Sequence, residues 1–127
     1  VEHAAVLGPC HYLEDKGYAV DDDPDVILEY GGEQWKRRVE PDLVVQMDGA
    51  DWPVEVQREV SERLLGKWEK ALEKTGCLII VLFNEQKRRR QEQLLWRWQQ
   101  MPRDSEVRLI SLEAMENEDW EWTQVSV

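Results

Sequence analysis

Several residue types and sequence patterns are scarce in this chain of 127 residues. No apolar run approaches the length of a membrane span and no secretory leader is visible, so we expect no membrane association. Internal repeats and low-complexity linkers are also lacking. The sequence therefore predicts a single domain over residues 1–127, large enough to bury a core without disulfides or metal ions.

Cysteine is equally scarce. Cys10 and Cys77 lack the spacing of metal ligands, and we expect both to be reduced, small apolar side chains of a cytoplasmic protein. The chain begins with Val1 and not with Met, which is the pattern expected of a domain cut from a longer protein.

Basic residues are few relative to acidic ones. The sequence has 16 Lys and Arg against 27 Asp and Glu, a formal net charge of −11. This balance argues against a surface that binds nucleic acid everywhere. It leaves room for a local basic patch around an acidic metal centre.

The most informative stretch is an expected hairpin over Pro41–Glu59, whose two strands alternate between apolar and polar residues. We expect a four-residue turn over Asp48–Asp51, which would place Met47 opposite Trp52. Asp42 and Glu55 would then share a face as diagonal neighbours, roughly 7–8 Å apart at Cα. The opposite face is apolar and should be buried. Two carboxylates held side by side on a stiff hairpin resemble half of a divalent-cation site.

The remaining elements predict an α/β fold. We expect a helix, kinked at Pro9 and stopped by Gly17, followed by an acidic loop over Asp21–Asp25 and a strand over Val26–Tyr30. After the hairpin, helical and strand patterns alternate, which gives a mixed sheet of an antiparallel meander plus crossover strands, with helices on both faces. The expected later elements are a helix from Ser61 to Gly76, a strand over Cys77–Phe83, a helix from Asn84 to Pro102, and strands over Val107–Leu112 and Trp120–Val127.

This order of elements, with Pro41-Asp42 and Glu55-Val56-Gln57, resembles the PD-(D/E)XK, or restriction-endonuclease-like, nuclease superfamily. An early Glu-His followed by the hairpin is similar to replication-relaxation-type nuclease-like domains of bacterial plasmids and integrative elements. The resemblance implies a restriction-endonuclease-like sandwich that cleaves DNA with Mg²⁺ or Mn²⁺. It also implies metal binding by Asp42, Glu55 and the carbonyl of Val56, with Glu2 as an additional acid on the first helix.

The sequence departs from the superfamily pattern at Gln57, which occupies the position of the motif lysine. Glutamine can hydrogen-bond an attacking water but brings no positive charge. We therefore expect either weak catalysis or a lysine from elsewhere. Lys67 is the best donor because it borders the apolar face of its helix, whereas Lys70 points nearly opposite to that face.

Each of these residues also has an ordinary structural interpretation. Pro-Asp commonly opens a turn, an exposed strand Glu is commonplace, and a Glu near a terminus, such as Glu2, is usually solvated. His3 and His11 are positioned to contact phosphate or water near the site, but packed or surface histidines are the commoner case.

Two basic segments are candidates for nucleic-acid contact. Arg89 and Trp96 lie on a helical wheel opposite the stripe of Leu94, Leu95 and Trp98, and Arg97 lies beside Trp96. Such a face suits base stacking and phosphate contact, a protein interface, or a solvated helix equally well. The triplet Lys36, Arg37 and Arg38 is placed to flank bound phosphates or to offset nearby acids.

The resemblance thus implies a metal-dependent DNA nuclease, weakened by Gln57, and it alone implies a setting in mobile-element replication, repair or restriction. The alternative is a catalytically inactive DNA- or protein-binding module with the same fold. Trp120 and Trp122 would either close the sheet edge or pair with a partner chain, in a homodimer or a larger replication or mobilisation complex.

Overall fold

The computed structural model describes residues 3–22, 28–30, 37–39 and 41–126. Four helices and eight strands are present in these ranges. The helices are α1 (His3–Asp15), α2 (Leu65–Thr75), α3 (Glu85–Trp96) and α4 (Leu112–Glu116). The strands are β1 (Ala19–Asp21), β2 (Leu28–Tyr30), β3 (Arg37–Val39), β4 (Leu43–Met47), β5 (Ala50–Gln57), β6 (Cys77–Leu82), β7 (Glu106–Ser111) and β8 (Thr123–Ser126). No helix in the described ranges is both long and apolar enough to cross a membrane.

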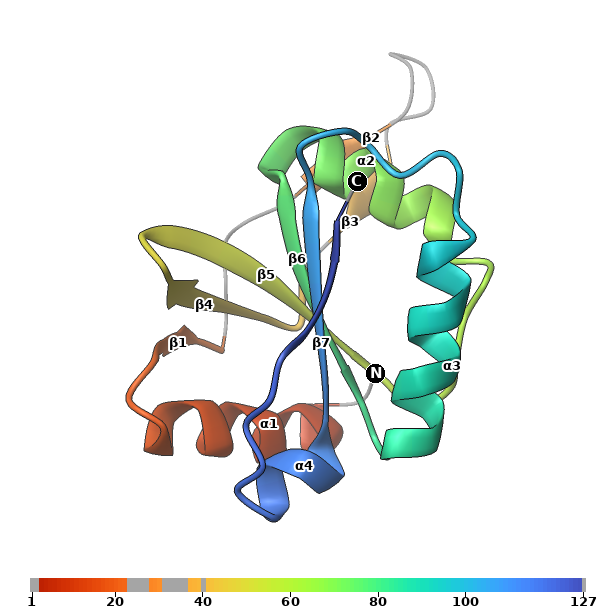
Figure 1. The fold of residues 1–127 in the computed structure, drawn as a ribbon. Coiled ribbons are helices and arrows are strands. Elements are labelled where there is room, and N and C mark those ends of the chain that lie inside the picture. The colour runs from red at the N-terminus through yellow and green to blue at the C-terminus, as the bar shows by residue number, and fades with distance from the viewer. Residues whose placement is uncertain (1–2, 23–27, 31–36, 40, 127) are drawn as a thin grey trace.

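A six-stranded open mixed sheet with the order β1-β4-β5-β6-β7-β8 forms the centre of the fold (Figure 1). Strands β5, β6 and β7 are parallel, whereas β1, β4 and β8 join by antiparallel pairing. The predicted α/β class, with a mixed sheet that includes parallel crossover strands, is confirmed.

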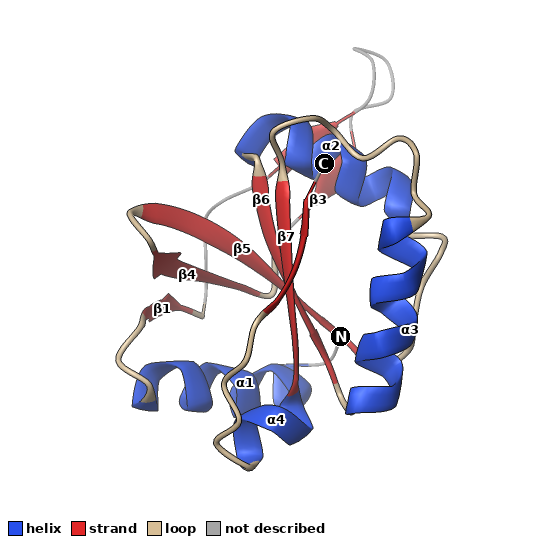
Figure 2. Cartoon of the chain, viewed as in Figure 1, coloured by secondary structure: helices blue, strands red, loops and turns tan. Residues whose placement is uncertain are grey.

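Helices cover both faces of this sheet, as predicted (Figure 2). Helices α1 and α4 pack on one face of the sheet, against side chains that include Val54, Val56 and Ile79. Helices α2 and α3 make the two parallel crossovers and pack on the other face, over Leu78 and Ile80. Strand β6 is buried on both faces because it lies between two parallel neighbours and under two helical layers.

Three helix ends match the local sequence signals and two do not. Helix α2 begins at Leu65 and not at the predicted Ser61, whose hydroxyl instead accepts the N–H of Leu64 in the turn before the helix. Helix α1 runs continuously through Pro9, and Gly17 ends it with φ 98°. Gly76 ends α2 in the left-handed region at φ 75°, and the side chain of Asn84 caps α3 by accepting the N–H of Lys87. Helix α3 stops at Trp96, earlier than the predicted end near Pro102, although Trp98 and Met101 beyond it are still buried.

The predicted hairpin turn is wrong in length. Met47 pairs with Ala50, so the turn has two residues, Asp48 and Gly49, with φ 53° and 77°. Positive φ at both positions is the geometry that Asp-Gly favours in a tight hairpin, and Ala50 and Asp51 continue the strand. The register therefore differs by two residues from the prediction. Because side chains alternate with a period of two, the predicted shared face of Asp42 and Glu55 is unaffected.

The edges of the sheet also differ from the prediction. Strand β1 ends at Asp21, the first residue of the expected acidic loop, and it pairs with β4 to form one sheet edge. Asp23 and Asp25 of that loop lie outside the described residues. Strand β2, expected in the central meander, instead pairs with β3 in a separate two-stranded sheet beside α2. A three-residue strand such as β1 has too few residues to show an alternating pattern, which explains why it was missed.

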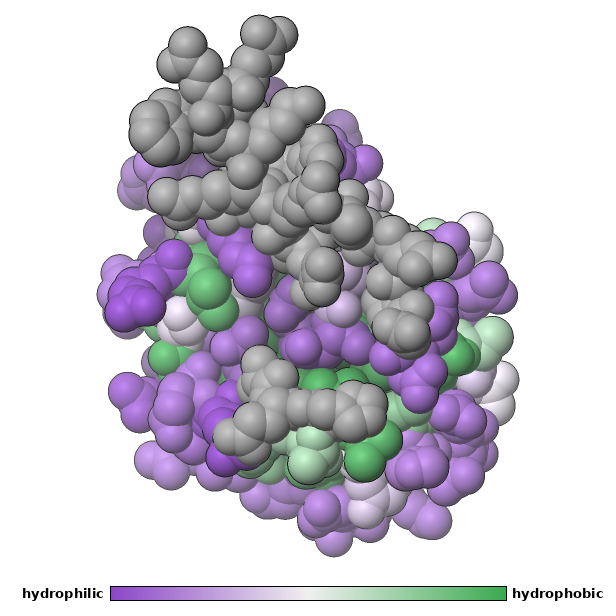
Figure 3. Space-filling view, turned by 180° about the vertical axis from the view of Figure 1, so that it is seen from behind, coloured by the Kyte–Doolittle hydropathy of each residue, from purple (hydrophilic) through white to green (hydrophobic). Residues whose placement is uncertain are grey.

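The C-terminal segment contains an unpredicted helix, α4, that starts where β7 ends because the hydroxyl of Ser111 accepts the N–H of Ala114 at 2.9 Å. Strand β8 is shorter than predicted, and it forms the second sheet edge beside β7. Trp120 and Trp122 precede it and pack half-buried against the α1 side of the sheet. Seen from behind, the described residues that are visible are mostly hydrophilic, with some apolar residues among them (Figure 3).

Candidate active site

Asp42 lies immediately before β4, with its carboxylate next to the backbone of β5. Its N–H donates to the carbonyl of Val54 at 3.0 Å, and its Oδ2 accepts the N–H of Val56 at 2.8 Å. Continuing the β4–β5 register past Leu43 brings Asp42 next to Glu55. The two predicted acids therefore converge, as neighbours across the hairpin and not as diagonal neighbours.

Glu55 is buried, with 6% of its surface exposed, and it points to the α2 side of the sheet, next to Ile80 of β6. Burial raises the pKa of Glu55 to about 7, and the negative charge of Asp42 adds to this rise. Desolvation and a neighbouring like charge both disfavour the ionised carboxylate. Glu55 is thus an acid that changes protonation near neutral pH.

Lys67 of α2 supplies positive charge near this acid pair. Its charge lowers the pKa of Glu55 and so opposes the effects of burial and of Asp42. Lys67 is half-buried, whereas Lys70 is exposed and pairs with Glu73 at 3.6 Å. The helix therefore leaves Lys70 exposed and Lys67 half-buried, as the apolar spacing of the helix predicted.

Gln57 is the last residue of β5 and is half-buried on the same side as Glu55. It borders a shallow hollow of about 490 Å³ in the connection between β5 and α2. The hollow is lined by Gln57, Arg58, Glu59, Val60, Ser61, Glu62, Arg63 and Leu64. An amide at this place can hydrogen-bond a water molecule next to the acids.

Helix α3 holds this connection in place through two side chains. Gln91 is fully buried; its Oε1 accepts the N–H of Ser61 at 2.9 Å and its Nε2 donates to the Ser61 carbonyl at 3.1 Å. Lys87, one turn earlier, donates to the carbonyl of Arg58 at 2.8 Å. Sequence reasoning missed both contacts. The available signal was a glutamine within the apolar stripe of α3, four residues before Leu95.

The described residues supply only part of a metal-ligand set. Asp42 and Glu55 converge, but no group of three or more His, Cys, Asp and Glu residues that could hold a metal ion occurs in the described ranges. Glu2, the predicted third acid, lies outside these ranges, as does Lys36. Val56 lies between Glu55 and Gln57, and its side chain packs toward α1.

The other predicted contacts are distributed over the molecule. Arg37 and Arg38 belong to β3, and their side chains, like that of His3, lie outside the described part. His11 is exposed on α1, which covers the opposite face of the sheet from the acid pair. It is therefore a surface histidine, the commoner of the two interpretations.

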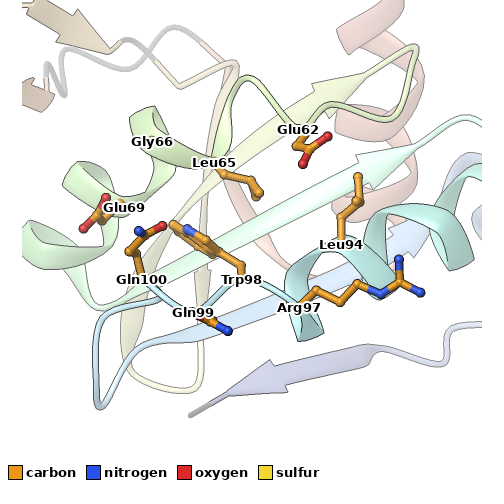
Figure 4. A pocket seen from close by; sticks show the side chains of 9 residues that line it. All are labelled: Glu62, Leu65, Gly66, Glu69, Leu94, Arg97, Trp98, Gln99 and Gln100. Carbon is orange, nitrogen blue, oxygen red and sulfur yellow. The ribbon is translucent and has the colours of Figure 1, made fainter.

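Arg89, Trp96 and Arg97 are exposed on α3 and at its end, as the helical wheel predicted. Arg97 also borders a pocket of about 490 Å³ between α2 and the end of α3, and extends away from Gln99 and Gln100 (Figure 4). This pocket also contains Glu62 and Glu69, whose negative charges disfavour a phosphate inside it.

Comparisons of the chain with family models, with curated proteins and with solved structures gave no match. The resemblance to PD-(D/E)XK nucleases therefore remains a hypothesis, based on the Pro41-Asp42 and Glu55-Val56-Gln57 segments and on the order of the elements.

Proposed function

We propose that this chain is a nuclease domain of the PD-(D/E)XK type, which hydrolyses DNA phosphodiesters with Mg²⁺ or Mn²⁺. The observation that carries the proposal is the convergence of Asp42 and Glu55 across the hairpin, where the positive charge of Lys67 is near enough to lower the pKa of Glu55. The mixed sheet with helices on both faces is compatible with the restriction-endonuclease-like sandwich that the proposal requires.

The acid pair has the electrostatic character of a divalent-cation site. Asp42 and Glu55 repel each other enough to contribute to the raised pKa of Glu55, and Lys67 offsets this only in part. Carboxylate oxygens are the ligands that Mg²⁺ and Mn²⁺ prefer. Asp42, Glu55 and the carbonyl of Val56 would hold the ion, with Glu2 as an additional acid. A bound ion would supply positive charge against the phosphate and help for the leaving oxygen.

The remaining residues have roles that follow from their charge and position. Lys67 provides a fixed positive charge next to the acids, which is the contribution that Gln57 lacks. Gln57 hydrogen-bonds and orients the attacking water from the end of β5. Arg89, Trp96 and Arg97 contact the DNA from α3, on the same side of the sheet as the acid pair. Lys36, Arg37 and Arg38 are proposed to flank its phosphates.

A catalytically inactive DNA- or protein-binding module is the competing function. Gln57 in the motif lysine position and the net charge of −11 favour it. The retention of both acids at one place, with Lys67 beside them, favours the enzyme.

The two functions are separated by incubating the protein with single-stranded, duplex and branched DNA in Mn²⁺. If the protein is a nuclease, we expect it to cleave DNA, the Asp42→Ala variant to lose this activity and the Asp51→Ala variant to keep it. Asp51 is a matched control because it is an exposed acid at the opposite end of β5.

Binding of Mn²⁺ alone, followed by its electron paramagnetic resonance signal, provides a second measurement. Mn²⁺ binding that is lost in Asp42→Ala, together with cleavage, supports the enzyme. DNA or protein binding without cleavage and without Mn²⁺ binding supports the inactive module.

A further inference from the structure

The outer face of α3 is free of acidic residues, which is unusual in a chain with 27 Asp and Glu. With about 100° per residue, six positions fall within one sector of the helix surface, and all six are exposed. We call this sector the α3 outer face; it consists of Gln86, Arg89, Arg90, Gln93, Trp96 and Arg97. No hydrogen bond or ion pair joins the side chains of Arg89, Arg90 or Arg97 to other described residues. Arg89 acts on Glu85 only through its charge, so all three guanidinium groups keep their hydrogen-bond donors for a ligand.

Trp96 is the largest exposed apolar side chain of this face, with 57% of its surface exposed. Its ring is oriented, because Nε1 donates to Glu92 at 3.3 Å. Glu92 in turn accepts a hydrogen bond from Arg88 at 3.0 Å, and Arg88 bonds Thr123 of β8 at 2.8 Å. This chain of contacts holds an aromatic ring at the surface, where it adds little to the core.

We propose that the α3 outer face binds single-stranded DNA, with Trp96 stacking on an unpaired base and Arg89, Arg90 and Arg97 contacting the phosphates. Arginines that follow a backbone, together with an aromatic ring that stacks on bases, are the usual elements of single-strand binding. The bases of a duplex are already stacked on each other, so the ring of Trp96 can stack only on an unpaired base.

The face is also placed to guide a strand toward the acid pair. Arg89 and Trp96 are separated by about 10 Å along the helix, and the helix starts beside the end of β5, where Lys87 bonds the Arg58 carbonyl. A strand that follows the face toward the N-terminus of α3 therefore reaches the region of Gln57. The choice of DNA as ligand rests on the proposed function, but binding to this face requires neither metal nor cleavage.

Fluorescence anisotropy in EDTA, with a fluorescein-labelled oligothymidine and a duplex of equal length, tests the proposal. We expect Trp96→Ala to weaken binding of the single strand by about 10-fold and to leave duplex binding unchanged, and Trp96→Phe to retain most of the affinity. Arg89→Ala and Arg97→Ala should weaken binding of both DNAs and reduce the salt dependence by about one charge each.

Two controls lie outside the face. Leu7→Ala removes another exposed large apolar side chain, and Lys16→Ala removes an exposed positive charge just after α1, on the opposite face of the sheet. Equal losses for single strand and duplex in Trp96→Ala, unchanged binding in that variant, or losses of the same size in the controls would overturn the proposal. So would a protein ligand that requires Trp96 when no DNA binds.

The outcomes also separate this proposal from the nuclease. If the protein binds single-stranded DNA through Trp96 but cleaves no DNA, the nuclease proposal is wrong and the proposed binding role of the α3 outer face stands. If the protein cleaves DNA and Trp96→Ala does not change DNA binding, only the proposed binding role of the α3 outer face is wrong.

Discussion

Glu55 differs from the other buried polar residues in the described ranges. Gln91 bonds the backbone of Ser61, Ser105 bonds the carbonyl of Pro102, and Ser111 bonds Glu85. No hydrogen bond from another described residue reaches the carboxylate of Glu55. Desolvation of Glu55 and the nearby negative charge of Asp42 make its ionised form costly, so its protonation is linked to folding.

Glu55→Gln should therefore change how stability depends on pH. Between pH 4.5 and about 7 the folded wild type keeps a proton that the unfolded chain has lost, so its free energy of unfolding falls as the pH rises. In EDTA, we expect the variant and the wild type to be similar at pH 4, and the variant to be more stable by roughly 3 kcal/mol at pH 8. Urea unfolding at a series of pH values measures this. Asp51→Asn is the control, and parallel curves for wild type and Glu55→Gln would contradict the prediction.

Lys67→Ala should remove the positive charge near the acid pair. We expect the pKa of Glu55 to rise above 7, as followed by carbon-13 NMR of its carboxyl group, because Lys67 lowers it. We also expect cleavage to slow by about 100-fold if the nuclease proposal is correct. Lys70→Ala, on an exposed face of the same helix, should change neither quantity. Intact metal-dependent cleavage in Lys67→Ala would end the assignment of Lys67 as the substitute for the motif lysine.

At the scale of elements, α3 and the connection between β5 and α2 act as one unit. Gln91 satisfies both the N–H and the carbonyl of Ser61, and the Ser61 hydroxyl accepts the N–H of Leu64 at 3.2 Å. Helix α2, and with it Lys67, therefore starts from a fixed point.

Gln91→Leu should destabilise the protein by about 2 kcal/mol, because it removes both hydrogen-bond partners of the half-buried Ser61 backbone and leaves its N–H and carbonyl without them. Urea unfolding measures the change. Gln93→Leu is the matched control, since Gln93 is exposed on the same helix and should shift stability by less than about 0.5 kcal/mol. Equal effects of the two substitutions would show that the Ser61 contacts contribute little.

The tip of the β4–β5 hairpin is held from β7. Arg108 bonds Asp48 at 2.9 Å and lies over the ring of Trp52, with 4.5 Å between its guanidinium carbon and the ring centre. We expect Arg108→Ala to cost about 2 kcal/mol, because this half-buried side chain loses both its packing and its cation–π contact. Asp48→Asn should cost less than about 0.5 kcal/mol, since Asp48 is largely exposed and asparagine tolerates its positive φ. Thermal unfolding of the two variants separates packing from charge.

At the scale of the whole molecule, the two cysteines report on global unfolding. Burial, together with the Glu14 side chain, raises the pKa of the Cys10 thiol to about 12, and burial also raises the pKa of Cys77. We expect a thiol reagent at pH 8 to label both at least about 1,000-fold more slowly in the native protein than in urea. Rapid labelling of either thiol under native conditions would reveal local opening of its helix or strand.

Local signals in the sequence predicted much of this fold. The continuous apolar run of β6, the stop at Gly76 and the cap at Asn84 each depend on neighbouring residues, and each is confirmed. Features that depend on distant residues were not predicted. Strand β1 exists because β4 offers it an edge, and the roles of Gln91 and Arg108 depend on partners 30 and 60 residues away.

The shared face of Asp42 and Glu55 was predictable for a different reason. Alternation along a strand has a period of two, so a register that was wrong by two residues preserved it. Their actual proximity, and the approach of Lys67, required the positions of the turn and of α2.

The two-residue turn at Asp48–Gly49 limits which changes in length this protein can accept. Adding a single residue there, if the pairing of β4 with β1 and of β5 with β6 is maintained, would send one of the two carboxylates into the apolar layer beneath α1. Insertions and deletions in this turn should therefore add or remove an even number of residues. An odd number would move Asp42 and Glu55 to opposite faces of the sheet although neither residue is changed.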